Sequence, residues 1–235
     1  DPNSVYAVIA NYQLGADLQQ AEKWAEARRY YKAVVEAEST DQNKEYQKLA
    51  TQQVKQIDQY LLGVQIQNYI DKQDWKNVSI VLKPLLEKQG AEASVDLVIL
   101  WRKAEIAQQN WKEALSTWDL QREVDSESAA SPEALIQQGS LKEQIGDNTG
   151  ALFSYRKVLE NVDDPTLETQ VVGRVSSILQ QQRNYTELVK FYSQRYEKSS
   201  DPDVKKNSAS EIATYYATVL ENSESARIWW EKVDQ

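Results

Sequence analysis

The sequence has 235 residues, of which 41% are apolar and 27% charged. It contains only seven glycines and five prolines, and such low counts favour helices over sheets, because sheets need many turns. Its formal net charge of -9 makes nucleic acid an unfavourable ligand. Cysteine and histidine are both absent, which excludes disulfides, thiolate nucleophiles, the usual zinc sites and most general-base schemes, so we expect neither an enzyme nor a cofactor. No apolar run approaches the roughly 18 residues that would span a bilayer.

Six short segments along the chain each end in a small or aliphatic residue, which we term the anchor. The anchors are spaced 51, 36, 37, 37 and 38 residues apart, and they are Ala27, Val78, Ala114, Ala151, Leu188 and Ala226. A large residue follows each anchor four positions later, on the same face of a helix: Tyr31, Leu82, Trp118, Tyr155, Tyr192 and Trp230. A further helical segment precedes each anchor, so the repeating unit is helix A, a short turn and helix B. The predicted repeats cover about residues 8–40, 59–90, 95–126, 132–164, 168–199 and 205–235.

The first spacing exceeds the others by about 14 residues, and the surplus falls within residues 41–60. Apolar residues there keep an unbroken helical phase: Tyr46, Ala50, Val54, Ile57, Leu61 and Val64. This pattern predicts either one long helix from about residue 44 to 72 or an extra helix over residues 43–60. Gly63 is the expected place for a break in the long helix.

Loops between the repeats are marked by proline and by short polar side chains. Pro132, Pro165 and Pro202 stand where proline is tolerated, at the first turn of a helix. Ser131 and Asp201 are predicted to cap the helices that follow them. Residues 125–131 are rich in serine and alanine, and we expect a hinge there.

The repeating unit resembles the tetratricopeptide repeat. Residues of the first and fourth units carry the resemblance: Leu14, Gly15, Leu18, Trp24, Ala27 and Tyr31, then Leu135, Gly139, Gly146, Ala151, Tyr155, Val158 and Pro165. The resemblance covers almost the whole chain and implies an all-α fold, a right-handed superhelix of about six helical hairpins that forms a single solenoid over residues 1–235. The chain departs from the family in its longer period and in Ile66 and Arg102, which replace the small residue of helix A.

The resemblance also implies small residues where helices A and B cross closely, with large residues wedged beside them. The expected packing residues are Gly15, Trp24, Ala27, Tyr31, Trp75, Trp111, Ala114, Trp118, Gly139, Ala151, Tyr155, Leu188, Tyr192, Ala226 and Trp230. Trp24, Trp75 and Trp111 occupy one equivalent position, and the alternative for these three is an aromatic ligand cage.

In tetratricopeptide proteins the A helices line a concave groove that contacts the partner. The equivalent positions here are Tyr12, Gln20, Gln67, Asp71, Asp96, Lys103, Glu143, Gln144, Gln181, Glu211 and Tyr215. The basic clamp of chaperone-binding members is missing, because Tyr12 and Ala16 stand at its positions, so we expect no chaperone-tail binding. The expected groove is polar and mildly acidic, and it suits a protein segment that carries Lys or Arg.

These features predict a non-catalytic scaffold or adaptor. The missing cysteine and the glutamine-rich acidic sequence favour a place in a bacterial envelope assembly, and the cytoplasm is the alternative location. A second hypothesis makes the chain an accessory superhelical domain of a larger envelope enzyme, or of a secretion or polysaccharide machine. No polar capping helix follows Trp229 and Trp230, and terminal repeats usually need one. A third hypothesis is self-assembly through that uncapped end.

Overall fold

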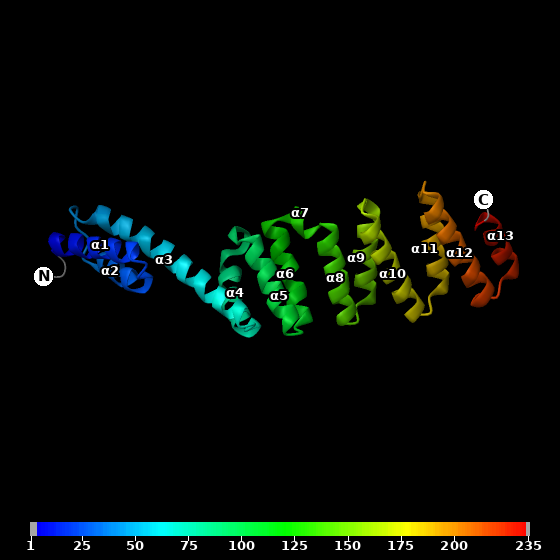
Figure 1. The fold of residues 1–235 in the computed structure, drawn as a ribbon, viewed down its shortest axis with the longest axis horizontal. Coiled ribbons are helices and arrows are strands. Elements are labelled where there is room, and N and C mark those ends of the chain that lie inside the picture. The colour runs from blue at the N-terminus through cyan, green and yellow to red at the C-terminus, as the bar shows by residue number, and fades with distance from the viewer. Residues whose placement is uncertain (1–3, 234–235) are drawn as a thin grey trace. The chain divides into compact units, whose positions relative to one another are not determined.

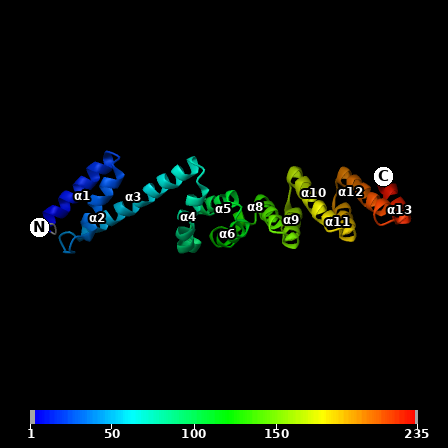
Figure 2. The same ribbon diagram turned by 90° about the horizontal axis from the view of Figure 1, so that it is seen from below.

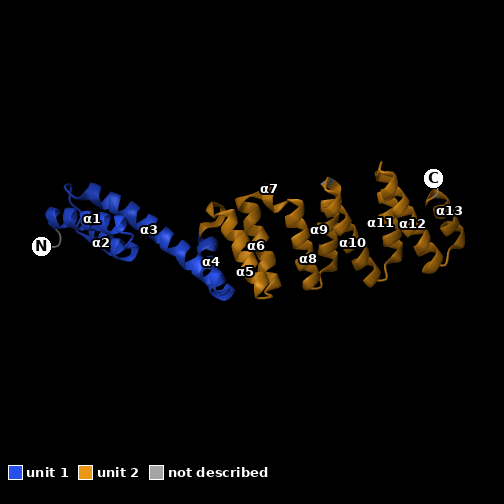
Figure 3. Cartoon of the chain, viewed as in Figure 1, with its two compact units in different colours: residues 1–88 blue, residues 89–235 orange. Residues whose placement is uncertain are grey.

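The computed structural model describes residues 4–233, without the side chain of residue 161. This part of the chain forms α-helices and one short 3-10 helix, with no strand, so the predicted all-α fold is confirmed. The structure divides into two compact units, residues 1–88 and 89–235 (Figure 3). The sequence predicts one solenoid with a hinge at residues 125–131, whereas the boundary between the compact units falls at residue 88.

Unit 1 and unit 2 carry all the helices shown in Figure 1. The helices of unit 1 are α1 (Val5–Gln20), α2 (Trp24–Glu36), α3 (Lys44–Asp71) and α4 (Trp75–Gln89), whose last residue already counts in unit 2. Those of unit 2 are η1 (Gly90–Glu92), α5 (Val95–Ala107), α6 (Trp111–Val124), α7 (Ser126–Ala129), α8 (Pro132–Gln144), α9 (Asn148–Asn161), α10 (Pro165–Gln181), α11 (Tyr185–Lys198), α12 (Pro202–Thr218) and α13 (Ser223–Val233).

Six helix–turn–helix pairs account for all the long helices of the described chain: α1/α2, α3/α4, α5/α6, α8/α9, α10/α11 and α12/α13. Helix A packs against helix B in five of these pairs, and α3/α4 shares the same kind of turn. All six anchors are buried, with Ala226 the most exposed of them at 4%. The hand of the superhelix stays a prediction.

One residue in each turn between helix A and helix B has a left-handed backbone. These residues are Glu22, Gln73, Gln109, Gly146, Arg183 and Glu221, with φ between 50° and 78°. Each stands five positions before its anchor. In the first five turns the next residue donates its N–H to the carbonyl five positions back, as from Asp147 to Lys142 at 2.9 Å. That bond closes the C-terminus of helix A in a Schellman arrangement.

Helix α3 confirms the first of the two alternatives for the surplus residues, since it runs unbroken for 28 residues. The break expected at Gly63 is absent, and that prediction was wrong. Ala50 and Ile57 are buried on one face of α3 before the glycine, and Ile66, nine residues after Ile57, is buried on the opposite face after it. One interior glycine costs about 1 kcal/mol relative to alanine, which is too little to interrupt a helix packed on both sides.

The segment expected to be a hinge, residues 125–131, contains the short helix α7. The Asp125 side chain accepts a hydrogen bond from the Ser128 N–H at 3.0 Å, and Gln121 of α6 donates to the Ser128 hydroxyl at 2.9 Å. Ala129 is buried in the core formed with α6 and α8. Hydrogen bonds and packing therefore hold this segment within unit 2.

The predicted starts of three A helices are confirmed. Pro132, Pro165 and Pro202 are each the first residue of their helix. The Ser131 side chain accepts a hydrogen bond from the Ala134 N–H, and Asp201 accepts one from the Asp203 N–H. Asp164 caps α10 in the same way, by accepting a hydrogen bond from the Thr166 N–H.

Close crossings of helices A and B occur where the sequence places its glycines. A Cβ atom added to Gly15 would lie 2.9 Å from the Tyr31 ring, and one added to Gly139 would lie 2.6 Å from the Tyr155 ring. Both tyrosines are buried in the cores of their units. The rings occupy the space that a side chain at the glycine would need.

Tryptophans at the predicted packing positions divide into two groups. Trp24 stacks at 4.5 Å on the ring of Tyr60, and Trp118 is fully buried. Trp230 departs from the prediction, because it is 42% exposed. Its neighbour Trp229 packs instead, with its ring edge-on to Tyr196 at 5.3 Å. Adjacent residues point about 100° apart on a helix, so only one of the two can face the core.

We predict opposite effects for alanine at two helical glycines. Gly139→Ala should lower the free energy of unfolding by about 1–3 kcal/mol, because the buried Tyr155 ring must shift. Gly63→Ala should raise it by about 0.5–1 kcal/mol, because the new methyl group meets nothing and helix propensity improves. Urea unfolding followed by circular dichroism checks both, and equal effects at the two sites would contradict the close crossing.

We also predict that glycine at a left-handed turn position stabilises the hairpin. Arg183→Gly should raise the free energy of unfolding by about 0.5–1 kcal/mol, since glycine adopts this backbone without steric cost. Gly146→Ala is the converse substitution at the equivalent turn and should lower stability by about 1 kcal/mol. Thermal unfolding measures the pair, and a loss of stability in Arg183→Gly would count against a strained turn.

Candidate functional site

The A and B helices of unit 2 lie in two rows (Figure 2). Helices α5, α8, α10 and α12 form one row, and the B helices pack against its inner side. We define the A face as the exposed residues on the other side of this row. They are Asp96, Ile99, Lys103, Glu133, Gln137, Gln144, Gln170, Gly173, Arg174, Gln181, Asn207, Glu211, Thr214 and Thr218.

Five of the seven predicted groove residues of unit 2 lie exposed on the A face: Asp96, Lys103, Gln144, Gln181 and Glu211. Glu143 does not belong with them. It is half-buried, accepts a hydrogen bond from the Tyr155 hydroxyl, and has an oxygen 3.9 Å from the Arg174 guanidinium of the next hairpin. Its carboxylate therefore holds two hairpins together.

Tyr215 is a second correction among the predicted groove residues. Its side chain is only 9% exposed, its hydroxyl accepts a hydrogen bond from Gln180, and its ring stacks on Tyr192 at 6.5 Å. Tyr192 in turn shares a hydrogen bond of 2.8 Å with the Ser176 hydroxyl. These contacts join the fifth and sixth hairpins, so Tyr215 belongs to the core.

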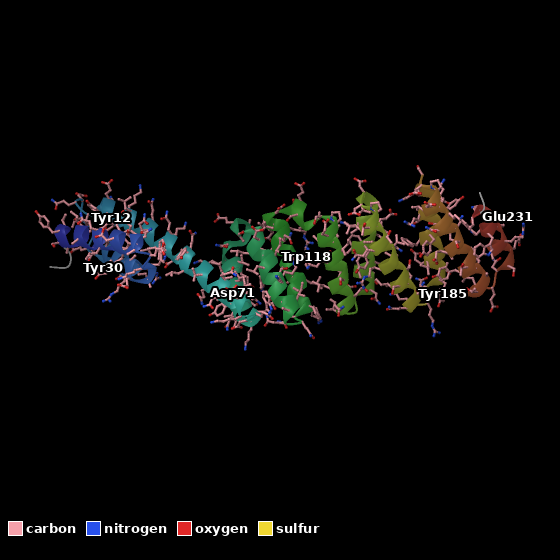
Figure 4. All side chains as sticks on the ribbon, viewed as in Figure 1. Tyr12, Tyr30, Asp71, Trp118, Tyr185 and Glu231 are labelled. Carbon is pink, nitrogen blue, oxygen red and sulfur yellow. The ribbon has the colours of Figure 1, made fainter. Side chains whose placement is uncertain are left out.

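Four further predicted groove residues lie in unit 1, separate from the A face. Tyr12 is a packing residue, because its ring meets Tyr31 at 5.4 Å and Tyr46 at 5.5 Å, both edge-on. Gln20 is exposed at the end of α1. Gln67 and Asp71 are exposed on α3 and bonded to each other at 2.7 Å, and Figure 4 marks both Tyr12 and Asp71.

Charge on the A face is sparse and slightly negative. Lys103 and Arg174 are its cations, against the carboxylates of Asp96, Glu133 and Glu211. The remaining side chains are mostly amides and hydroxyls. Some of the hydroxyls are used locally, as Thr214 donates to the Ser210 carbonyl at 2.8 Å. Over residues 4–233 no three acidic side chains gather to hold a metal ion, and no helix is long and apolar enough to cross a bilayer.

Gly173 is an unusual member of the A face. It stands in the interior of α10, where glycine costs about 1 kcal/mol relative to alanine. A Cβ atom there would meet nothing within 4 Å, in contrast to Gly15 and Gly139. No contact within the chain makes use of its missing side chain, so the backbone of α10 is open to close approach from outside.

Arg102 stands at the position of Gly15 and Gly139 in the third hairpin and is only 2% exposed. Its guanidinium lies 3.4 Å from the centre of the Trp118 ring, and it donates hydrogen bonds to Thr117 at 2.8 Å and to Gln121. Burial lowers the pKa of Arg102 to about 10. The sequence marked this residue only as a departure from the repeat, and its contacts assign it to packing.

No family model matches the sequence, and no curated protein matches it. Among solved structures, the chain is similar to the crystal structure of the TPR domain of P58(IPK), with 20% identity and a TM-score of 0.45. The alignment covers 97% of this chain and 64% of that one, so the chain spans less than two thirds of that structure's length. The fold is an array of helical hairpins, as the turns and crossings of this chain establish.

Four buried tyrosines make the stability of the hairpins depend on alkaline pH. Burial raises the pKa of Tyr31, Tyr155, Tyr192 and Tyr215 above the usual value. Each contribution is therefore complete below about pH 10, the pKa of an unfolded tyrosine, and is lost as the pH rises through the folded pKa. Arg102 and Lys142 act in the opposite direction, because burial lowers the pKa of each and this adds stability as the pH rises toward the unfolded pKa, but they are two groups against four.

We predict that the free energy of unfolding falls between about pH 10 and pH 12, and that Tyr155→Phe makes this fall shallower by about one proton's contribution. Urea unfolding across this range measures the slope. Tyr6→Phe is the matched control, since Tyr6 is 86% exposed, and it should leave the slope unchanged. An identical slope in wild type and Tyr155→Phe would show that burial does not perturb this phenol.

Proposed function

We propose that the chain is a non-catalytic scaffold that binds a segment of another protein on the A face of unit 2. An array of hairpins presents a long surface whose side chains are not needed for packing, and solenoids are suited to binding other proteins on such a surface. Five exposed polar residues predicted as partner contacts share that face: Asp96, Lys103, Gln144, Gln181 and Glu211.

Gly173 is the observation that carries this proposal. The core gains nothing from glycine at this position, and the helix is weakened by it. A partner whose backbone approaches α10 closely would benefit from the missing side chain, because a Cβ would hold it away. The amides of Gln170 and Gln181 flank the glycine on the same exposed side, where they can bond to backbone groups.

The charges on the A face indicate the charge expected of the bound segment. Three carboxylates against two cations, within a chain of net charge -9, favour a segment that carries Lys or Arg. This preference weakens as salt screens the exposed charges. A role within a larger envelope assembly is a further proposal, and it rests on the composition alone, as does the location in the cell.

We predict that Gly173→Gln blocks partner binding and does not weaken the fold. Its matched control is Gly63→Gln, because both glycines are exposed, helical and free of neighbours within 4 Å. Immobilised wild-type and variant chains would be exposed to an extract of the cells that naturally make the protein, and the retained proteins quantified by mass spectrometry. The partner should be retained about tenfold less by Gly173→Gln and unchanged by Gly63→Gln.

Thermal unfolding keeps this test interpretable, since both substitutions improve helix propensity and neither should lower the unfolding temperature. Ile228 and Trp230 are exposed on α13, so self-association through this helix is the alternative. The same experiment detects it as retention of the free chain by the immobilised one. A set of retained proteins that is identical for the two glutamine variants would place the binding surface elsewhere.

A further inference from the structure

A pocket of about 330 Å³ lies among the B helices of unit 2, apart from the A face. Helices α9 and α11 form two of its walls, and the A helices contribute only Glu168 from the start of α10 and Val204 from the start of α12. None of the residues defined as the A face lines it. The pocket is therefore a separate candidate for binding, and nothing in the proposed function uses it.

The apolar part of the pocket is formed by Leu159, Val162, Phe191 and Val204. Phe191 is 8% exposed and belongs to the core of the last three hairpins, where Leu159 and Val162 pack against it. The apolar surface is thus continuous with the core and held in place by it. A volume of this size lies at the lower end for ligand pockets and accommodates one large side chain.

The charged side chains around this apolar surface differ in whether they have a partner of opposite charge. Arg195 binds Glu168 through Nε at 3.2 Å and Nη2 at 2.8 Å, both on the same carboxylate oxygen. Arg156 is paired with Glu187 at 2.7 Å. Lys198 also lines the pocket, and its ammonium group has no hydrogen bond or ion pair with any described residue. Among the carboxylates that line the pocket, Glu160 is the one that likewise has no hydrogen bond or ion pair with any described residue.

An exposed aromatic residue lies on α9 beside the residues that line the pocket. Phe153 is 61% exposed, and it stands three and seven positions before Arg156 and Glu160, on the same side of the helix. The Lys157 ammonium lies 4.9 Å from the centre of its ring and has no ion pair among the described residues. Among the lining residues three cations, Arg156, Arg195 and Lys198, stand against the two carboxylates of Glu160 and Glu168, and Lys157 adds a cation beside the pocket.

We propose that this pocket binds an acidic segment of a partner protein, which inserts one large apolar side chain against Phe191 and pairs its carboxylates with Lys198 and Lys157. Burial of an aromatic or branched aliphatic side chain supplies most of the affinity. The unpaired ammonium groups select carboxylates beside that side chain. In a chain of net charge -9, this local excess of positive charge is opposite to that of the A face, so the two surfaces suit different partners.

The test uses the whole chain and a defined probe, the peptide acetyl-Asp-Glu-Phe-Glu-Asp-amide, titrated into isotope-labelled protein and followed by amide chemical shifts. Saturable shifts are expected at Val162, Phe191 and Lys198. Replacing the probe's Phe by Ala should abolish the shifts, because the apolar anchor is lost. Replacing its four acidic residues by Lys and Arg should weaken binding at least about tenfold.

Two variants on α11 form a matched pair. Lys198→Glu should weaken binding of the acidic probe about tenfold, whereas Lys190→Glu, an identical charge change on the same helix outside the pocket, should weaken it by about threefold or less. Circular dichroism confirms the fold of each. Equal losses in the two variants, tighter binding of the basic peptide, or shifts confined to the A face would overturn the proposal. Gly173→Gln should leave probe binding unchanged, so failure of the A face and failure of the pocket are distinguishable.

Discussion

The left-handed residue in each A–B turn sets the register on which the rest of the hairpin depends. It stands five positions before the anchor in all six turns, so the same number of residues separates the turn from the anchor of helix B in every hairpin. In the first, third, fourth and fifth hairpins the residue four positions after the anchor falls on the crossing with helix A, as where Gly15 meets Tyr31 and Gly139 meets Tyr155, whereas Trp230 of the sixth is exposed. Only one of the six turns has glycine at this position, so packing of the two helices must outweigh about 1–2 kcal/mol of backbone strain in each of the others.

The crossing of helices A and B is filled by different residues in different hairpins. The fifth hairpin pairs a serine with a tyrosine through the 2.8 Å bond between Ser176 and Tyr192. In the third, the Arg102 guanidinium stacks on Trp118 and is held by Thr117 and Gln121, with no carboxylate. Burying that cation without a counter-ion costs free energy, and the same desolvation lowers its pKa. The repeat conserves a filled crossing, and the residues that fill it differ from hairpin to hairpin.

Periodicity predicted the features that depend on residues close in sequence: the six hairpins, the unbroken α3, the buried anchors and the proline and serine starts of the A helices. It failed where contacts between hairpins decide the outcome. Tyr12, Glu143 and Tyr215 share positions with exposed residues of other repeats, yet Tyr46, Arg174 and Tyr192 engage them from neighbouring elements. The boundary at residue 88 lies beside Gly90, where the sequence predicts an ordinary end of a repeat, and the serine-rich stretch at residues 125–131 is fixed by a hydrogen bond from Gln121 that no local pattern encodes.

The two rows of helices give unit 2 two surfaces of different character. On the A face the side chains are small or amide-bearing, carboxylates slightly outnumber cations, and Gly173 leaves the backbone open. The pocket among the B helices has an apolar floor continuous with the core and an excess of cations. Because different helices supply most of each surface, a short segment bound at one leaves the other accessible. The basic segment proposed for the A face and the acidic segment proposed for the pocket therefore do not compete for one site.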